Sequence, residues 1–404
     1  MRPYTGGTPG LEQSWRWFGP HDPVSLQEVR QTGAAGIVTA LHHIPVGEIW
    51  PVEEILRRRA MIEAAGLRWR VVESLPVHEE IKKRSGQYNR WISNYRQSLV
   101  NLGRCGINIV CYNFMPVLDW LRTDLRVMCA DGGITTRFEA DLFAAFDLFI
   151  LRRPEAEQEH AGERLIRAQR IYNGLSEGKR EELTRTILLG LPGSLEAYSL
   201  NELRAAIRQY EGIGIPDLRR NLLEFLAGII PAAEESGVTL AIHADDPPWP
   251  VLGLPRVVTG SADLGNIFAV SDSPAHGLTF CTGSFGAKVS NDLVAMAGRF
   301  ASRIAFIHLR NVSRNDAGDF REEDHLEGDV DMPGIMRVLV LEQRRREEVG
   351  RPDRWMPFRP DHGRLMDPDR GKEGIYPGYS LFGRMRGLAE LRGLELGVRR
   401  SLGL

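Results

Sequence analysis

The fold of this chain is decided by TLAIH (239–243), LTFC (278–281), IAFIH (304–308) and PFRPDH (357–362), four short apolar runs that each end in a possible metal ligand. Their lengths and their β-branched or aromatic content predict strands. Because side chains alternate along a strand, Ala241 shares a face with His243, while Leu240 and Ile242 point the other way. Bulky residues on one face and reactive residues at the strand ends predict a closed parallel barrel.

The residues before and between these runs complete the barrel. Further strands are predicted at 14–18, 36–40, 68–74 and 107–113, and helical sequence separates them. Eight strands that alternate with helices predict an α/β fold, a (β/α)8 TIM barrel that forms one domain over residues 1–404. From about residue 118 to about residue 216 the alternation stops. The charged helical sequence there predicts a helical insertion after the fourth strand.

Composition excludes several classes of protein. The 404 residues carry a formal net charge of -2, which gives no general attraction to nucleic acid or to an anionic membrane. No apolar stretch is long enough to span a bilayer, and residues 1–10 lack the apolar core of a signal peptide, so we expect a cytoplasmic protein. Four cysteines without CxxC spacing are expected to be reduced thiols.

The strand ends predict a metal site. A thiolate, two imidazoles and a carboxylate would come together if the carboxyl ends of the strands share one rim: Cys281, His243, His308 and Asp361. Soft ligands favour zinc, but open coordination positions for a substrate suit Mn²⁺, Fe²⁺ or Co²⁺. Spacing alone does not decide between these metals.

Residues that follow the predicted ligands offer proton transfer. Asp361 and His362 are adjacent, and in extended backbone they cannot both point into the barrel mouth. His362 is therefore the candidate for proton transfer, since its ordinary pKa suits that role. Tyr376, in a loop rich in glycine and proline, is a second candidate proton carrier or an ordinary rim aromatic.

Other strand ends offer groups for binding a substrate. Arg310 and Arg16 are the candidates for holding a carboxylate, because a guanidinium can donate two parallel hydrogen bonds to it. His42 and Asn113 follow the second and fourth strands, so they are expected on the same rim as the metal ligands.

At these residues the chain resembles the D-mannonate dehydratase family nearly from end to end. The similarity is carried by long and unusual motifs, which include WRWFGPHDPVSL (15–26), GIVTALHHIPVGEIW (36–50), AIHADDPPWP (241–250), FIHLRN (306–311), RPDHGRLM (359–366) and YPGYS (376–380). The resemblance implies a xylose-isomerase-like barrel with Mn²⁺ bound by His243, Cys281, His308 and Asp361. It implies that His362 and Tyr376 form the acid/base pair.

The activity implied by the resemblance is removal of water from D-mannonate to give 2-dehydro-3-deoxy-D-gluconate, a step of hexuronate (glucuronate) catabolism. The expected partner is a small sugar acid, and we expect a homo-oligomer. One alternative is a metal-dependent sugar isomerase or epimerase on the same barrel. A second is a non-catalytic binding protein with a closed, four-coordinate zinc site.

Overall fold

A computed structural model describes residues 10–189 and 198–404. Residues 1–9 lie outside the described residues, and with them most of the stretch 1–10 for which the sequence predicts no signal peptide. Residues 190–197, inside the insertion predicted at about 118–216, also lie outside them. Within the two described ranges, no helix combines the length and the apolar character needed to cross a membrane.

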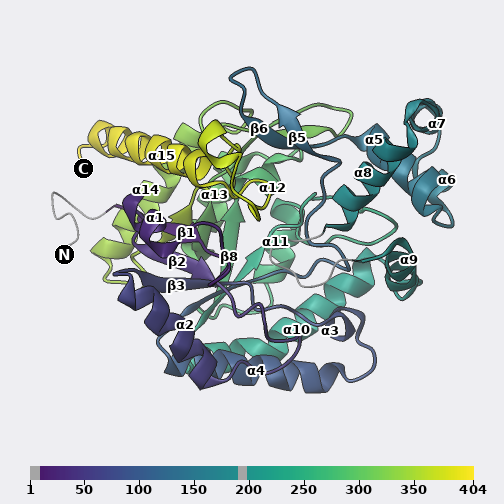
Figure 1. Cartoon of the computed structure of the whole chain (residues 1–404). Helices are drawn as coiled ribbons and strands as arrows, with labels where there is room; N and C mark the ends of the chain where they lie inside the picture. Colours follow the sequence, from purple (N-terminus) through teal and green to yellow (C-terminus); the bar gives the residue numbers. More distant parts are fainter. Residues whose placement is uncertain (1–9, 190–197) are drawn as a thin grey trace.

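Eight parallel strands close into the predicted barrel (Figure 1). Around the ring they follow the order β1-β2-β3-β4-β7-β8-β9-β12, and β12 pairs with β1. Their bounds are β1 (Glu12–Arg16), β2 (Gly36–Thr39), β3 (Arg68–Glu73), β4 (Ile109–Tyr112), β7 (Thr239–His243), β8 (His276–Cys281), β9 (Ile304–His308) and β12 (Pro357–Arg359). Every predicted barrel strand is confirmed.

The predicted alternation of side chains is also confirmed. Ala241 packs in the barrel interior with Val38, Val71 and Phe306 in a small apolar cluster. Leu240 and Ile242 belong instead to the large core between the strands and the outer helices. The interior is therefore filled with side chains, and the reactive residues are left at its mouth.

Helices surround the strands. Ser25 caps the first of them and forms a capping box with Glu28. Of the two longest helices, residues 215–235 begin with a proline-containing turn, and residues 381–401 follow the last loop. The bounds are α1 (Leu26–Gln31), α2 (Val52–Ala64), α3 (Glu79–Lys83), α4 (Tyr88–Arg104), α10 (Ile215–Glu235), α11 (Ser261–Phe268), α12 (Thr282–Gly286), α13 (Leu293–Phe300), η2 (Ala301–Arg303), α14 (Met332–Glu348), η3 (Asp367–Asp369) and α15 (Leu381–Ser401).

The insertion follows β4 as predicted, but it begins with strands that the sequence analysis did not predict. β5 (Asp124–Met128) and β6 (Ile134–Phe138) pair with β11 (Phe320–Glu323) and β10 (Asn311–Arg314) in a separate sheet of order β10-β11-β6-β5. The rest is helical: α5 (Ala140–Ala145), the π-helical η1 (Phe146–Leu151), α6 (Ala156–Glu159), α7 (Glu163–Gly174), α8 (Glu177–Leu188) and α9 (Leu200–Arg208). Because β10 begins just after His308, the small sheet adjoins the barrel mouth.

Candidate metal and substrate site

Three of the predicted metal ligands converge at the carboxyl ends of adjacent strands. His243 ends β7, Cys281 ends β8 and His308 ends β9. The parallel register places Cys281 directly opposite His308. One donor atom from each of the three side chains lies within 4.8 Å of the others. The strand register therefore builds the cluster.

The two imidazoles are arranged to accept a cation. His243 Nδ1 lies 2.6 Å from the carbonyl oxygen of Ala244, to which it donates its proton. His308 Nε2 lies 3.4 Å from the carboxylate of Glu73, which favours a proton on that nitrogen. With these tautomers, the lone pairs of His243 Nε2 and His308 Nδ1 face each other across 3.1 Å. Such a pair is favourable with a cation between the nitrogens, so the donor set fits a divalent transition metal.

Asp361 borders this cluster. Its Oδ2 lies 3.6 Å from Cys281 Sγ, and its Oδ1 lies 3.7 Å from His308 Nδ1. Burial alone would raise the pKa of Asp361, but Arg359, His362 and Arg310 hold that pKa well below its ordinary value. The side chain is therefore a carboxylate, the form that a metal binds.

The backbone conformation at Asp361 allows two adjacent residues, Asp361 and His362, to line the same cavity. Asp361 has φ 47°, which is the left-handed region and not extended strand. The alternation expected of a strand is broken there, and both Asp361 and His362 line the cavity at the barrel mouth. The prediction that only one of them can point inward assumed extended backbone, and that condition does not hold.

His362 is held by a carboxylate that the sequence analysis missed. The two carboxylate oxygens of Glu322, on β11, lie 2.9 Å and 2.8 Å from His362 Nδ1. A proton on Nδ1 leaves the lone pair on Nε2, the nitrogen that lies 3.3 Å from the hydroxyl of Tyr379. Burial alone would raise the pKa of Glu322, but His362, Arg310 and Arg122 lower it.

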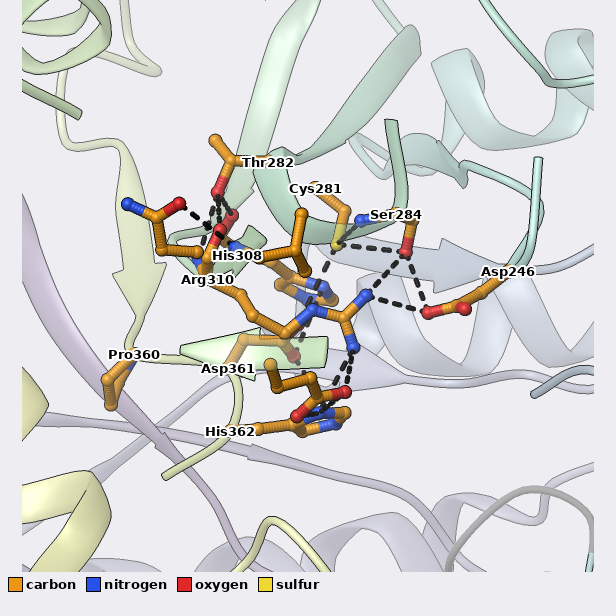
Figure 2. A network of polar contacts seen from close by, with 12 residues as sticks. Asp246, Cys281, Thr282, Ser284, His308, Arg310, Pro360, Asp361 and His362 are labelled. Atoms are coloured by element: carbon orange, nitrogen blue, oxygen red, sulfur yellow. Dashed lines mark hydrogen bonds and ion pairs between the residues drawn. The ribbon is translucent and has the colours of Figure 1, made fainter. Parts of the chain in front are cut away.

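Arg310 is the centre of a buried charge network rather than a free guanidinium (Figure 2). It donates to Asp246 at 2.7 Å and to Glu322 at 3.0 Å, and its Nε lies 3.3 Å from Asp361. Ser284 accepts a further hydrogen bond at 3.1 Å. Arg310 lines the cavity as predicted, but in this structure its charge holds carboxylates of the protein in place.

The glycine-rich turn after β8 makes room for that network. A Cβ on Gly283 would collide with the side chain of Arg310. The glycine at position 283 serves the close approach of this arginine.

Two tyrosines of the last loop are placed differently. Tyr379 is buried, lines the cavity and has its pKa raised to about 12 by burial. Gly378 allows this, since a Cβ there would meet His362 at 2.9 Å. Tyr376 does not line the cavity, and its ring packs on Phe18 with centroids 5.2 Å apart. The sequence analysis did not select Tyr379, because YPGYS (376–380) contains two tyrosines and the sequence does not show which of them faces the cavity.

Arg16 is a buried cavity residue with unused donors. Its Nε and Nη1 make no hydrogen bond to any described residue. Nη1 lies 3.7 Å from Glu73, and Nη2 lies 3.4 Å from His42 Nε2. Burial, Arg16 and Arg58 lower the pKa of His42 to about 3, so this imidazole is neutral and touches the cavity only through Arg16.

The remaining predicted residue, Asn113, lines the cavity beyond the end of β4 and donates to Asp119 Oδ2 at 3.4 Å. Arg359, which sequence reasoning also missed, donates to Glu73 at 2.7 Å and lies 2.6 Å from Asp361 Oδ1. Arg359 was hidden in strand sequence, because its partner Glu73 is distant along the chain.

Fold and site together define a (β/α)8-barrel protein with a cluster of sulfur and nitrogen donors that could hold a metal ion and a polar cavity at the carboxyl ends of its strands. Residues 11–402 match the family model described as D-mannonate dehydratase (UxuA). The chain belongs to the D-mannonate dehydratase family.

Similar proteins agree with this assignment. Over 393 residues the chain is 51% identical to a protein named mannonate dehydratase from a Marinomonas species, covering 97% of this chain and 100% of that one. The corresponding protein of Chromohalobacter salexigens is 53% identical, over 96% of this chain and 99% of that one. The solved structure of mannonate dehydratase from Streptococcus suis is 34% identical with a TM-score of 0.75, covering 98% of this chain and 95% of the other.

Proposed function

We propose that this protein is a hydro-lyase that removes water from D-mannonate to give 2-dehydro-3-deoxy-D-gluconate, as part of hexuronate breakdown. The observation that carries the proposal is the convergence of His243, Cys281 and His308 beside Asp361 and His362, in a chain of this family. A sugar isomerase or epimerase is not favoured, because the family match covers nearly the whole chain.

We propose Mn²⁺ as the metal, with Fe²⁺ or Co²⁺ as substitutes, held by His243, Cys281, His308 and Asp361. A divalent ion there would stabilise the negative charge that develops on oxygens of the sugar acid during elimination. The thiolate and the two imidazoles suit a transition metal better than Mg²⁺ or Ca²⁺.

The chain's own groups account for the proton transfers. Elimination requires loss of the proton at C2 and protonation of the hydroxyl that leaves C3, after which the enol becomes the ketone. His362 lines the cavity, and its Nδ1 lies 2.8 Å from Glu322, which favours a proton on that nitrogen and leaves Nε2 as the base. We assign one proton transfer to His362. The other is assigned to Tyr376 from the family resemblance alone, since Tyr376 does not line the cavity in this structure.

Binding of the substrate carboxylate is assigned to Arg16. Its Nε and Nη1 are free of hydrogen bonds within the part of the chain that the structure describes, whereas Arg310 is paired with Asp246 and Glu322. We propose that Arg310 orients Asp361 and His362 from behind. His42 and Asn113 would support the substrate site through Arg16 and through the cavity wall. Assembly into a homo-oligomer stays a prediction.

The test is metal reconstitution. The purified protein is stripped with a chelator and supplied with Mn²⁺, with Zn²⁺ or with no metal, and formation of the 2-keto-3-deoxy acid from D-mannonate is followed. We expect product with Mn²⁺ and none without metal. Absence of product with every divalent ion, in protein shown to be folded and metal-bound, would refute the proposed function.

A further inference from the structure

Asp119 stands apart from the other carboxylates of the cavity. Each of the others is ion-paired with arginine: Glu73 with Arg359 and, at 3.7 Å, with Arg16; Asp246 with Arg122 and Arg310; and Asp361 with Arg359 and Arg310. Asp119 makes no ion pair with any described residue, and its one hydrogen bond is the 3.4 Å contact from Asn113.

Two cations near Asp119 do not pair with it. Lys82 donates to Glu79 and to the carbonyl oxygen of Met115, both at 2.6 Å, and so is already engaged. Arg256 donates to the carbonyl oxygen of Leu118 at 2.7 Å, and its Nε and Nη1 make no hydrogen bond to any described residue, Asp119 included. Both cations act on Asp119 only through space, while burial raises its pKa. The carboxylate of Asp119 therefore has acceptor capacity that the protein does not use.

The barrel separates Asp119 from Arg16. Arg16 ends β1, and Asp119 follows β4, which stands three strands away on a ring of eight. Both residues nevertheless line the same cavity. One side of the mouth thus offers guanidinium nitrogens without a hydrogen bond, and the far side offers a carboxylate with a single long one. A ligand that is anionic at one end and carries hydroxyl groups at the other fits both.

We propose that Asp119 determines substrate specificity by accepting hydrogen bonds from the hydroxyl-bearing tail of the sugar acid and by repelling any substrate that carries a carboxylate at that end. This inference rests on the proposed function and names its selectivity. A carboxylate close to Asp119 would be buried against a like charge, and such juxtaposition is strongly unfavourable. Aldonates are therefore accepted, and aldarates, with a carboxylate at both ends, are rejected.

The test compares D-mannonate with D-mannaric acid, which has the same configuration at C2 to C5 and a second carboxylate at C6. The wild-type Mn²⁺ enzyme is assayed with both, and the inhibition constant of the diacid is measured against D-mannonate. We expect the diacid to bind at least about tenfold more weakly than D-mannonate. Equal affinity of the wild-type enzyme for both compounds would by itself overturn the proposal.

Variants at position 119 identify the residue responsible. In Asp119→Asn the preference for D-mannonate over the diacid should fall about tenfold, mainly through KM and the inhibition constant and with a smaller change in kcat. Asp119→Glu keeps the charge and should keep the discrimination. Asp124→Asn removes one negative charge from a partly exposed position of β5 and should leave the preference unchanged.

The outcomes separate this inference from the proposed function. If Asp119→Asn folds, turns over D-mannonate and keeps the wild-type preference within twofold, Asp119 does not determine specificity, while the dehydratase activity stands. If the wild-type protein fails with D-mannonate under every metal, it is the proposed function that fails.

Discussion

Strands β1 to β4 and strands β7, β8, β9 and β12 form two adjacent halves of one closed sheet, yet the side chains at their carboxyl ends differ in kind. The second half, here called the metal half, supplies His243, Cys281, His308 and, just after β12, Asp361. The first half, here called the binding half, supplies hydrogen-bonding groups, Arg16 and Asn113 among them. One barrel thus divides electron-pair donors for a cation from groups suited to a polyhydroxylated acid.

Glu73 connects the two halves. It ends β3 in the binding half, but its carboxylate lies 3.4 Å from His308 and accepts from Arg359, both in the metal half. A carboxylate behind a metal-binding imidazole fixes the ring and its tautomer. The binding half therefore also orients a metal-half residue that it does not itself provide.

The largest effect is expected from removing a donor of the metal half. In Cys281→Ala or His308→Ala, loss of one ligand should lower bound metal sharply and reduce kcat/KM by about 10³-fold or more, since the metal stabilises the transition state by several kcal/mol. Elemental analysis and the dehydration assay measure the two quantities. Cys129→Ala, at another buried thiol, is the matched control. Full metal content and activity in Cys281→Ala would remove the thiol from the ligand set.

A second, smaller effect separates proton transfer from metal binding. His362→Ala should keep its metal and lose about 10²- to 10⁴-fold in kcat, the usual contribution of a positioned acid or base. Tyr376→Phe should behave in the same way, while Tyr379→Phe, which removes a hydroxyl 3.3 Å from His362 Nε2, should lose only about tenfold. The opposite order of the two tyrosine variants would move the proton-carrier role to Tyr379.

The strand ends were predictable because each lies at the end of a local apolar pattern. TLAIH and IAFIH each predict a strand and place a histidine at its end. Because parallel strands end at one rim, the metal half could be located from the sequence. The binding half was predictable only in part. Arg16 and Asn113 were found as polar residues at strand ends. Nothing in the local sequence shows that Nε and Nη1 of Arg16 are left without hydrogen bonds.

Residues that act through distant partners were not predictable. Glu322 lies on β11, a strand of four residues that pairs with the preceding strand β10 and with β6 of the distant insertion. A short, charged strand of this kind has no periodicity long enough to detect. Asp246 lies in the motif AIHADDPPWP (241–250), yet its hydrogen bonds to Arg122 and Arg310 depend on tertiary packing. The left-handed backbone at Asp361 likewise leaves no signal in the sequence.

In the binding half, Arg16→Lys should raise KM for D-mannonate about tenfold and change kcat less. The variant keeps the positive charge but loses the planar fork that holds a carboxylate through two parallel hydrogen bonds. Steady-state kinetics measure this, with metal content as a check. Arg70→Lys, whose partner is Glu12 at the start of β1, is the control and should leave KM unchanged. A large fall in kcat with unaltered KM in Arg16→Lys would contradict the division between the halves.

The smallest effect concerns acid stability of the binding half. Burial and the cations Arg16 and Arg58 lower the pKa of His42 to about 3, below its ordinary value in the unfolded chain. As pH falls from about 6.5 toward 3, the unfolded state therefore binds a proton that the folded state does not, and this contribution to stability is lost. It is fully present above that window.

Denaturant unfolding at pH 7, 6 and 5 tests this account of His42. Stability should fall less steeply with acid in His42→Gln than in the wild-type protein, by at most about 1.4 kcal/mol per pH unit, the value for one proton. His43→Gln, at a neighbouring imidazole that is largely exposed, should reproduce the wild-type slope. Identical slopes for His42→Gln and wild type would mean that His42 binds its proton equally well in the folded and unfolded states. That result would contradict a neutral imidazole beside Arg16.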